Sequence, residues 1–224
     1  MKNRLLTLFC ANKENQGLLK WFLILDIVFI LGHFVLKISN NSPEFLMVDV
    51  DGSLPEIFQY LKYVALIILI SKLIYGKRKP VYFPWLFLFV LMLFDDALQL
   101  HERFGKFFAH FFELSNNFGL RSVDFGELIY AFLVGIIFFG SLFFCYTNAS
   151  KSDRKNHRDI LFLFLIFIFF AVGLDMLHQI SSHFNPYLFG VLAIAEDGGE
   201  MLVMSLMVWY FFNITFSKDE IPVF

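Results

Sequence analysis

Acidic and histidine side chains interrupt the longest apolar stretches of this chain, and their types and spacing suit chemistry. They are Asp95, Asp96, Glu102, Glu127, Asp175, His178, Glu196, Asp197 and Glu200. Ionisable groups inside a membrane are costly and usually face the interior of a helix bundle. Each of these residues is therefore a candidate functional residue.

Carboxylates that share a site of low dielectric constant cannot all remain ionised, so either several are protonated or a cation neutralises them. Carboxylates with imidazole suit a divalent ion of the zinc, iron or manganese class, whereas carboxylates alone suit magnesium or calcium. Asp175 and His178 have the spacing of the Glu-x-x-His elements in di-iron helix bundles. The expected metal site draws on Asp95, Glu102, Glu127, Asp175, His178, Glu196 and Glu200.

The elements that must position these residues are membrane-spanning helices. The chain has 224 residues, of which 58% are hydrophobic and only 17% are charged, and a spanning helix needs about 20 apolar residues. The composition predicts one all-α, polytopic membrane domain over residues 1–224. Six transmembrane helices are expected, at 19–38, 57–75, 82–102, 125–147, 160–180 and 188–212.

The basic residues predict the orientation of this domain. They gather before the first span, at 77–79 and at 151–158, whereas the connection between the first two spans is acidic. Cytosolic loops carry excess Lys and Arg, so both termini are expected in the cytosol, in a multi-pass protein of the plasma (inner) membrane. Residues 103–124 mix basic residues with phenylalanines, which predicts an amphipathic segment on the outer interface.

On this topology the acids of several spans lie at similar depth. Asp95, Asp175 and Glu196 fall roughly 10–12 Å below the outer boundary, from the rise of a helix. On the third span, Asp95 and Glu102 share a face and His101 points elsewhere. We expect one pocket that opens to the extracytosolic side.

Two segments together resemble a known pattern. Asp95-Asp96-x4-His101-Glu102, with Glu196-Asp197-x2-Glu200-Met201, is similar to uncharacterised bacterial multi-pass membrane proteins. Those proteins have an acidic pair followed by His-Glu on one helix, and an acidic pair followed by Glu-Met on the last. The resemblance covers about the C-terminal two-thirds of the chain. It implies that these residues belong together and implies no activity.

Three functions fit the pattern. The first is a metal-dependent hydrolase acting on a lipid or other outer-leaflet substrate, and the second is a proton or divalent-cation channel or transporter. The third is a sensor or effector subunit with a cytosolic protein partner, for example in stress or phage defence. The lipid bilayer is the expected environment and a homo-oligomer is a further option, while a net charge of −2 gives no basis for nucleic-acid binding.

The sequence also predicts the surroundings of four polar residues outside the cluster. Asp26 is expected as a lone buried acid bonded to a neighbouring helix, Lys62 as a side chain that extends outward, and His157 as a loop or interface residue. His33 is expected as a satisfied histidine of the core. The inner halves of the last three spans read as almost wholly apolar, which favours a one-sided site over a pore within one subunit.

Overall fold

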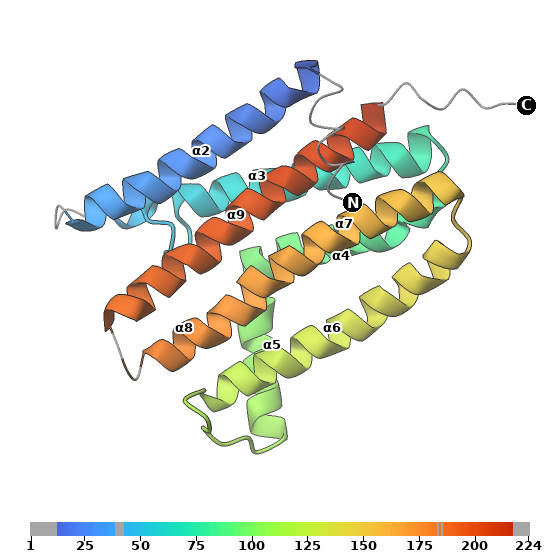
Figure 1. The fold of residues 1–224 in the computed structure, drawn as a ribbon. Helices are drawn as coiled ribbons and strands as arrows, with labels where there is room; N and C mark the ends of the chain where they lie inside the picture. Colours follow the sequence, from blue (N-terminus) through green and yellow to red (C-terminus); the bar gives the residue numbers. More distant parts are fainter. Residues whose placement is uncertain (1–12, 39–42, 183, 185, 217–224) are drawn as a thin grey trace, which may run out of the picture.

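The computed structural model describes residues 13–38, 43–182, 184 and 186–216, and these form a bundle of helices (Figure 1). The predicted all-α fold is confirmed for this part of the chain. The main helices are α2 (Lys13–Ile38), α3 (Leu54–Ser71), α4 (Phe83–Leu98), α5 (Leu100–Phe111), α6 (Ser122–Thr147), α7 (Lys151–Ile168), α8 (Asp175–Ser181) and α9 (Pro186–Phe216).

Five helical stretches of the described residues are long and apolar enough to cross a membrane. They are Gln16–Ile38, Leu54–Gly76, Pro80–Leu98, Ser122–Thr147 and Lys151–Ser181. They overlap the first five predicted spans, and large exposed side chains such as Trp21, Phe132 and Phe143 suit a surface in contact with lipid. The chain is therefore an all-helical protein with candidate membrane spans. Its termini, at 1–12 and 217–224, lie outside the described residues.

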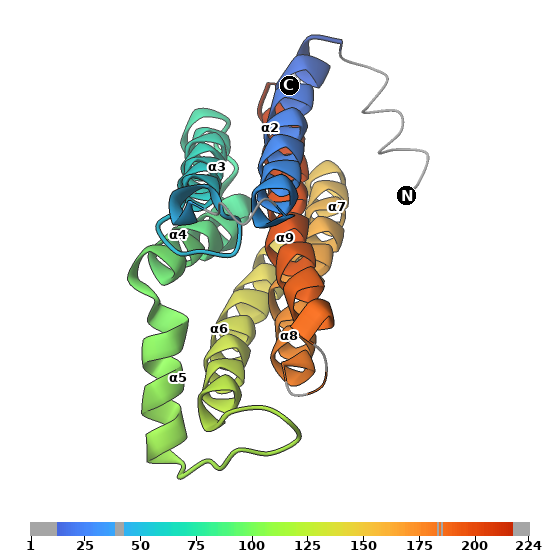
Figure 2. The ribbon, with the colours of Figure 1, turned by 90° about the vertical axis from the view of Figure 1, so that its left-hand side faces the viewer.

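The sixth predicted span, 188–212, lies within α9, which is not among those five stretches. Its first half carries Glu196, Asp197 and Glu200, and its second half is buried by the other helices rather than exposed. Helix α9 packs against α2, α3, α7 and α8, and it is the central helix of the bundle (Figures 1 and 2).

The third predicted span, 82–102, is wrong at its C-terminal end. Helix α4 stops at Leu98 because Gln99 takes a left-handed conformation, with φ of 51°, and α5 begins at Leu100 in a new direction. The Gln99 side chain donates a hydrogen bond to Asp51 at 2.9 Å. Asp95 and Glu102 therefore do not share one continuous helix face.

Helix α5 lies against the first half of α6 (Figure 2). Its outer side exposes Phe104, Phe107 and Phe111, as expected for an amphipathic segment. The two backbones touch at Gly105 and Gly126: a Cβ added at Gly126 would lie 2.1 Å from the Gly105 carbonyl oxygen. This crossing brings the beginning of α5 next to Glu127.

The end of the bundle that carries the basic segments 77–79 and 151–158, the basic end, is more polar than expected. Helix α7 begins at Lys151, so residues assigned to a loop belong to its first turns. His157, predicted as a loop or interface residue, is buried and accepts a hydrogen bond from the Trp85 indole at 2.9 Å. Tyr210 donates to Asp159 at 3.0 Å. The named inner stretches are almost wholly apolar, as expected, but α7 starts earlier than hydropathy suggests, so polar residues precede the apolar stretch within the same helix.

A buried ion pair joins three helices near the middle of the bundle. The Lys62 ammonium lies 2.5 Å from an Asp26 carboxylate oxygen, and both side chains are fully buried. Lys62 also donates to the Met201 carbonyl, and Ser205 donates to Asp26. The prediction that Lys62 extends outward is wrong. Asp26 is buried and bonded to neighbouring helices as predicted, although it is paired with a lysine rather than alone.

Candidate metal centre

A cavity of about 1210 Å³ is lined by acids of α8 and of the first half of α9, near the end of the bundle where α8 ends and α9 begins (Figure 1). All seven residues of the expected metal site line it, together with further acids from the connection between α2 and α3. We call its polar part, around these acids, the chamber. The ionisable lining residues of the chamber are Asp49, Asp51, Glu56, Asp95, Asp96, His101, Glu102, Lys106, Arg121, Glu127, Asp175, His178, Glu196, Asp197 and Glu200.

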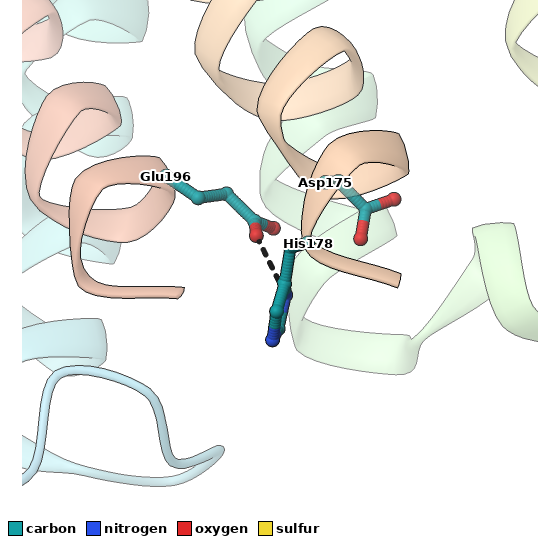
Figure 3. A group of neighbouring side chains, drawn as sticks. All are labelled: Asp175, His178 and Glu196. Atoms are coloured by element: carbon teal, nitrogen blue, oxygen red, sulfur yellow. Dashed lines mark hydrogen bonds and ion pairs between the residues drawn. The ribbon is translucent and has the colours of Figure 1, made fainter. Parts of the chain in front are cut away.

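Three of the seven predicted residues converge closely enough to hold one metal ion. Asp175, His178 and Glu196 each offer a ligand atom, and these atoms lie within 4.8 Å of one another. Figure 3 shows Asp175 and His178 on α8 and Glu196 reaching towards them from α9. The His178 Nδ1 atom lies 3.1 Å from a Glu196 carboxylate oxygen. One imidazole with two carboxylates is a donor set typical of zinc, iron or manganese.

Local structure positions these three side chains. A π-helical turn, η4 (Phe169–Leu174), ends where α8 begins at Asp175, and such turns are frequent at functional sites. Asp175 and His178 lie three residues apart and so occupy the same side of α8. Gly199 allows α9 to approach η4, because a Cβ at this position would lie 2.1 Å from the Phe170 ring. The Phe189 ring lies 4.1 Å from the His178 ring, centroid to centroid.

The other four predicted residues line the same cavity outside that group of three. Asp95 accepts a hydrogen bond from the backbone N–H of His101 at 2.7 Å, and the His101 Nδ1 atom lies 3.5 Å from the same carboxylate oxygen, so the expectation that His101 points elsewhere is wrong. Glu102 pairs with Lys106 at 2.8 Å, and Lys106 holds the pKa of Glu102 below its usual value. Glu127 and Glu200 line the chamber from α6 and α9.

His101 lies in the chamber wall, with its Nδ1 atom 3.5 Å from an Asp95 carboxylate oxygen. The neighbouring Asp95 carboxylate raises the pKa of His101 from 6.5 to about 9. Because the pKa of His101 is higher in the folded state, its protonation stabilises the fold. This contribution is fully present below the unfolded value of 6.5 and is lost as the pH rises through about 9.

We therefore expect the wild-type protein to lose more thermal stability between pH 6.5 and pH 9 than the His101→Gln variant loses. Glutamine keeps a polar side chain but cannot gain the proton. Melting temperatures of both proteins in detergent at the two pH values test this. Equal losses in the two proteins would show that the His101–Asp95 pair contributes nothing to stability.

Sequence reasoning missed the contribution of the connection between α2 and α3. Asp49, Asp51 and Glu56 line the chamber, although in the sequence their acidity was used only to predict the orientation of the spans. His33 is fully buried, as expected, and one of its ring nitrogens is hydrogen-bonded: Nδ1 accepts a hydrogen bond from the backbone N–H of Val48 at 3.2 Å. That bond anchors the connection. The acidity of this segment was visible in the sequence, but its folding over the chamber was not.

A comparison with known families places the chain. A family model described as a domain of unknown function (DUF8692) matches residues 21–214. The chain belongs to this family. The DUF8692 match covers four of the five candidate spans in full, most of the first span, and the three converging residues, in agreement with the expected membership of an uncharacterised family. No curated protein and no solved structure matches the chain.

Proposed function

We propose that this protein is a metal-dependent hydrolase of the membrane that acts on a lipid. The observation that carries the proposal is the convergence of Asp175, His178 and Glu196 on a cavity that is acidic at one end and apolar at the other. Three protein ligands that leave coordination positions open are typical of catalytic rather than structural zinc sites. An amphiphilic cavity between spanning helices suits a substrate that is itself amphiphilic.

The proposal includes a topology with six spans. Helix α9 has 31 residues, hence a length of roughly 46 Å, enough to cross a hydrocarbon core of about 30 Å. Its carboxylates face the chamber, so they need not contact lipid. The basic segments at 77–79 and 151–158 lie at the opposite end of the bundle, and the positive-inside rule assigns that end to the cytosol. The chamber then lies in the outer half of the plasma (inner) membrane, and both termini are cytosolic.

The chemistry divides between the metal and the surrounding acids. A bound divalent ion supplies a Lewis acid that activates water and polarises a carbonyl group. In our proposal, Asp175, His178 and Glu196 hold the ion, and a carboxylate of the chamber wall, Glu127 or Glu200, accepts a proton from the attacking water. The same carboxylate returns this proton to the leaving oxygen or nitrogen. Addition of water across an ester or amide bond yields an acid and an alcohol or amine, so the step needs no other reactant.

Elemental analysis of the purified full-length protein tests the metal site. We expect about one zinc, iron or manganese ion per chain. A chelator should remove this ion and should also abolish any release of fatty acid from a bilayer-lipid extract. Mass spectrometry of the extract before and after incubation measures that release. A wild-type protein that retains no divalent metal after gentle purification would contradict the proposal.

Cation transport is the second candidate, and one observation favours it. Buried polar contacts occur beyond the chamber at the Lys62–Asp26 pair and again at Tyr210 and Asp159, so buried polar groups are not limited to one half of the bundle. Ion flux in liposomes separates the two functions. Flux that depends on Lys62 and Asp26, with no lipid hydrolysis, would favour transport.

A further inference from the structure

The cavity continues from the chamber into an apolar slot between α4, α6 and α7. Leu88, Met92, Phe138, Phe164 and Phe167 form the walls of this slot. Along α6, the distance from Glu127 in the chamber to Phe138 at the bottom of the slot is roughly 16 Å, from the helical rise. The apolar lining therefore extends over a length that suits an extended alkyl chain.

The slot reaches the lipid-facing surface along α6. Phe132 and Ile136 line the cavity and are also 67% and 55% exposed. Helix α6 packs mainly against α5 and makes less contact with α4 and α7. An alkyl chain can thus enter from the bilayer between helices. Because the bilayer is as apolar as the slot, the chain gains little from the transfer, and the head group must supply the affinity.

The charges of the chamber select the head group. Eleven carboxylates line the cavity, against two histidines, one lysine and one arginine. Lys106 pairs with Glu102, and Arg121 pairs with Asp124 at 2.7 Å. Carboxylates that share such a site cannot all stay ionised, so several are protonated or a cation neutralises them. A chamber of this kind attracts a cation and repels a phosphate.

One uncharged side chain of the chamber, Gln59, has a hydrogen-bonding atom without a partner in the described part of the chain. Gln59 is 6% exposed and lines the cavity; its amide lies at the buried Tyr63 hydroxyl, and its amide oxygen is buried without a hydrogen bond to the rest of the described chain. A buried polar group is normally hydrogen-bonded in the functional state. The amide oxygen can accept from an ammonium N–H, and the amide nitrogen can donate to a carbonyl oxygen.

We infer that the cavity binds an amphiphile with a positively charged amine head in the chamber and one alkyl chain in the slot. Gln59 and the neighbouring carboxylates contact the head, and α4, α6 and α7 enclose the chain. The inference rests on the proposed function in that this amphiphile is the substrate class of the hydrolase. A lipid with a phosphate head is disfavoured for the same electrostatic reason.

The test measures binding and needs no turnover. Metal-free full-length protein in neutral nanodiscs is titrated with hexadecylamine and, separately, with hexadecyl phosphate, and native mass spectrometry measures the bound fraction. We expect the amine to bind at least about tenfold more tightly than the phosphate. Equal affinity for both, or tighter binding of the phosphate, would overturn the inference.

Two glycines of α6 provide a matched pair of variants. Gly135 lines the cavity, and a Cβ added there would lie 3.9 Å from the Phe139 ring, an ordinary contact, so Gly135→Leu adds side-chain volume to the cavity. Gly140 lies outside the cavity lining, with open space around it. Both substitutions favour the helix. Gly135→Leu should weaken hexadecylamine binding at least about tenfold and Gly140→Leu should not, and equal effects of the two would overturn the inference.

The outcomes separate this inference from the proposed function. Selective amine binding without any retained metal would remove the hydrolase and leave the amphiphile site. Retained metal with no preference for the amine would leave the metal site and remove this substrate class.

Discussion

Replacement of Lys62 by methionine is expected to destabilise the protein by about 3–5 kcal/mol, the usual cost of removing one partner from a buried ion pair. The Lys62 ammonium lies 2.5 Å from Asp26, and neither side chain is exposed. Without the lysine, the Asp26 carboxylate keeps only the hydrogen bond that Ser205 donates. The free energy of unfolding in mixed detergent and denaturant measures this effect.

Two further variants make the result specific. The double variant Asp26→Leu/Lys62→Met removes both charges, and it should recover most of the lost stability because an apolar pair of similar volume replaces a buried ion pair at little or no cost. Lys37→Met removes an exposed lysine that lies 3.4 Å from Asp49, and it should cost less than about 1 kcal/mol. If Lys62→Met and Lys37→Met destabilise the protein equally, the buried pair does not hold the bundle together.

Substitution of the converging residues should have the largest effect on the proposed activity. In His178→Ala and Glu196→Gln, we expect metal affinity to fall by more than about 100-fold, because even residues that only orient a ligand commonly cost 10–100-fold. Lipid hydrolysis should fall to background in both variants. Elemental analysis after dialysis against a metal buffer, and fatty-acid release from the same preparations, measure the two effects.

Glu102→Gln is the matched control because it is the same substitution as Glu196→Gln in the same cavity. Glu102 pairs with Lys106 and lies outside the group formed by Asp175, His178 and Glu196, so its variant should retain the metal. Metal loss in Glu102→Gln but not in Glu196→Gln would mean that the ion, if one binds, lies on the α5 side of the chamber. The assignment to α8 and α9 would then be wrong.

The amino-acid sequence alone determines the class of this protein and the identity of its unusual residues. Hydropathy over about 20 residues is a local property, so the first five apolar helices were predictable to within a few residues at most of their ends. The cost of burying charge made the acids within these helices conspicuous. All seven predicted site residues do line one cavity, because acids at similar depth on neighbouring helices face the same interior.

Only the tertiary structure decided which of these residues meet. The left-handed conformation of Gln99 turns α5 away from α4 and brings His101 to Asp95, which a continuous helix forbids. Lys62, which was predicted to extend outward, pairs with Asp26 on another helix. The spacing of residues within one helix cannot predict such a pairing. Asp175 and His178 share a face by their spacing, but Glu196 joins them only because Gly199 lets α9 approach Phe170. Contacts between helices depend on the shapes of two surfaces at once, whereas each stretch of sequence describes only one.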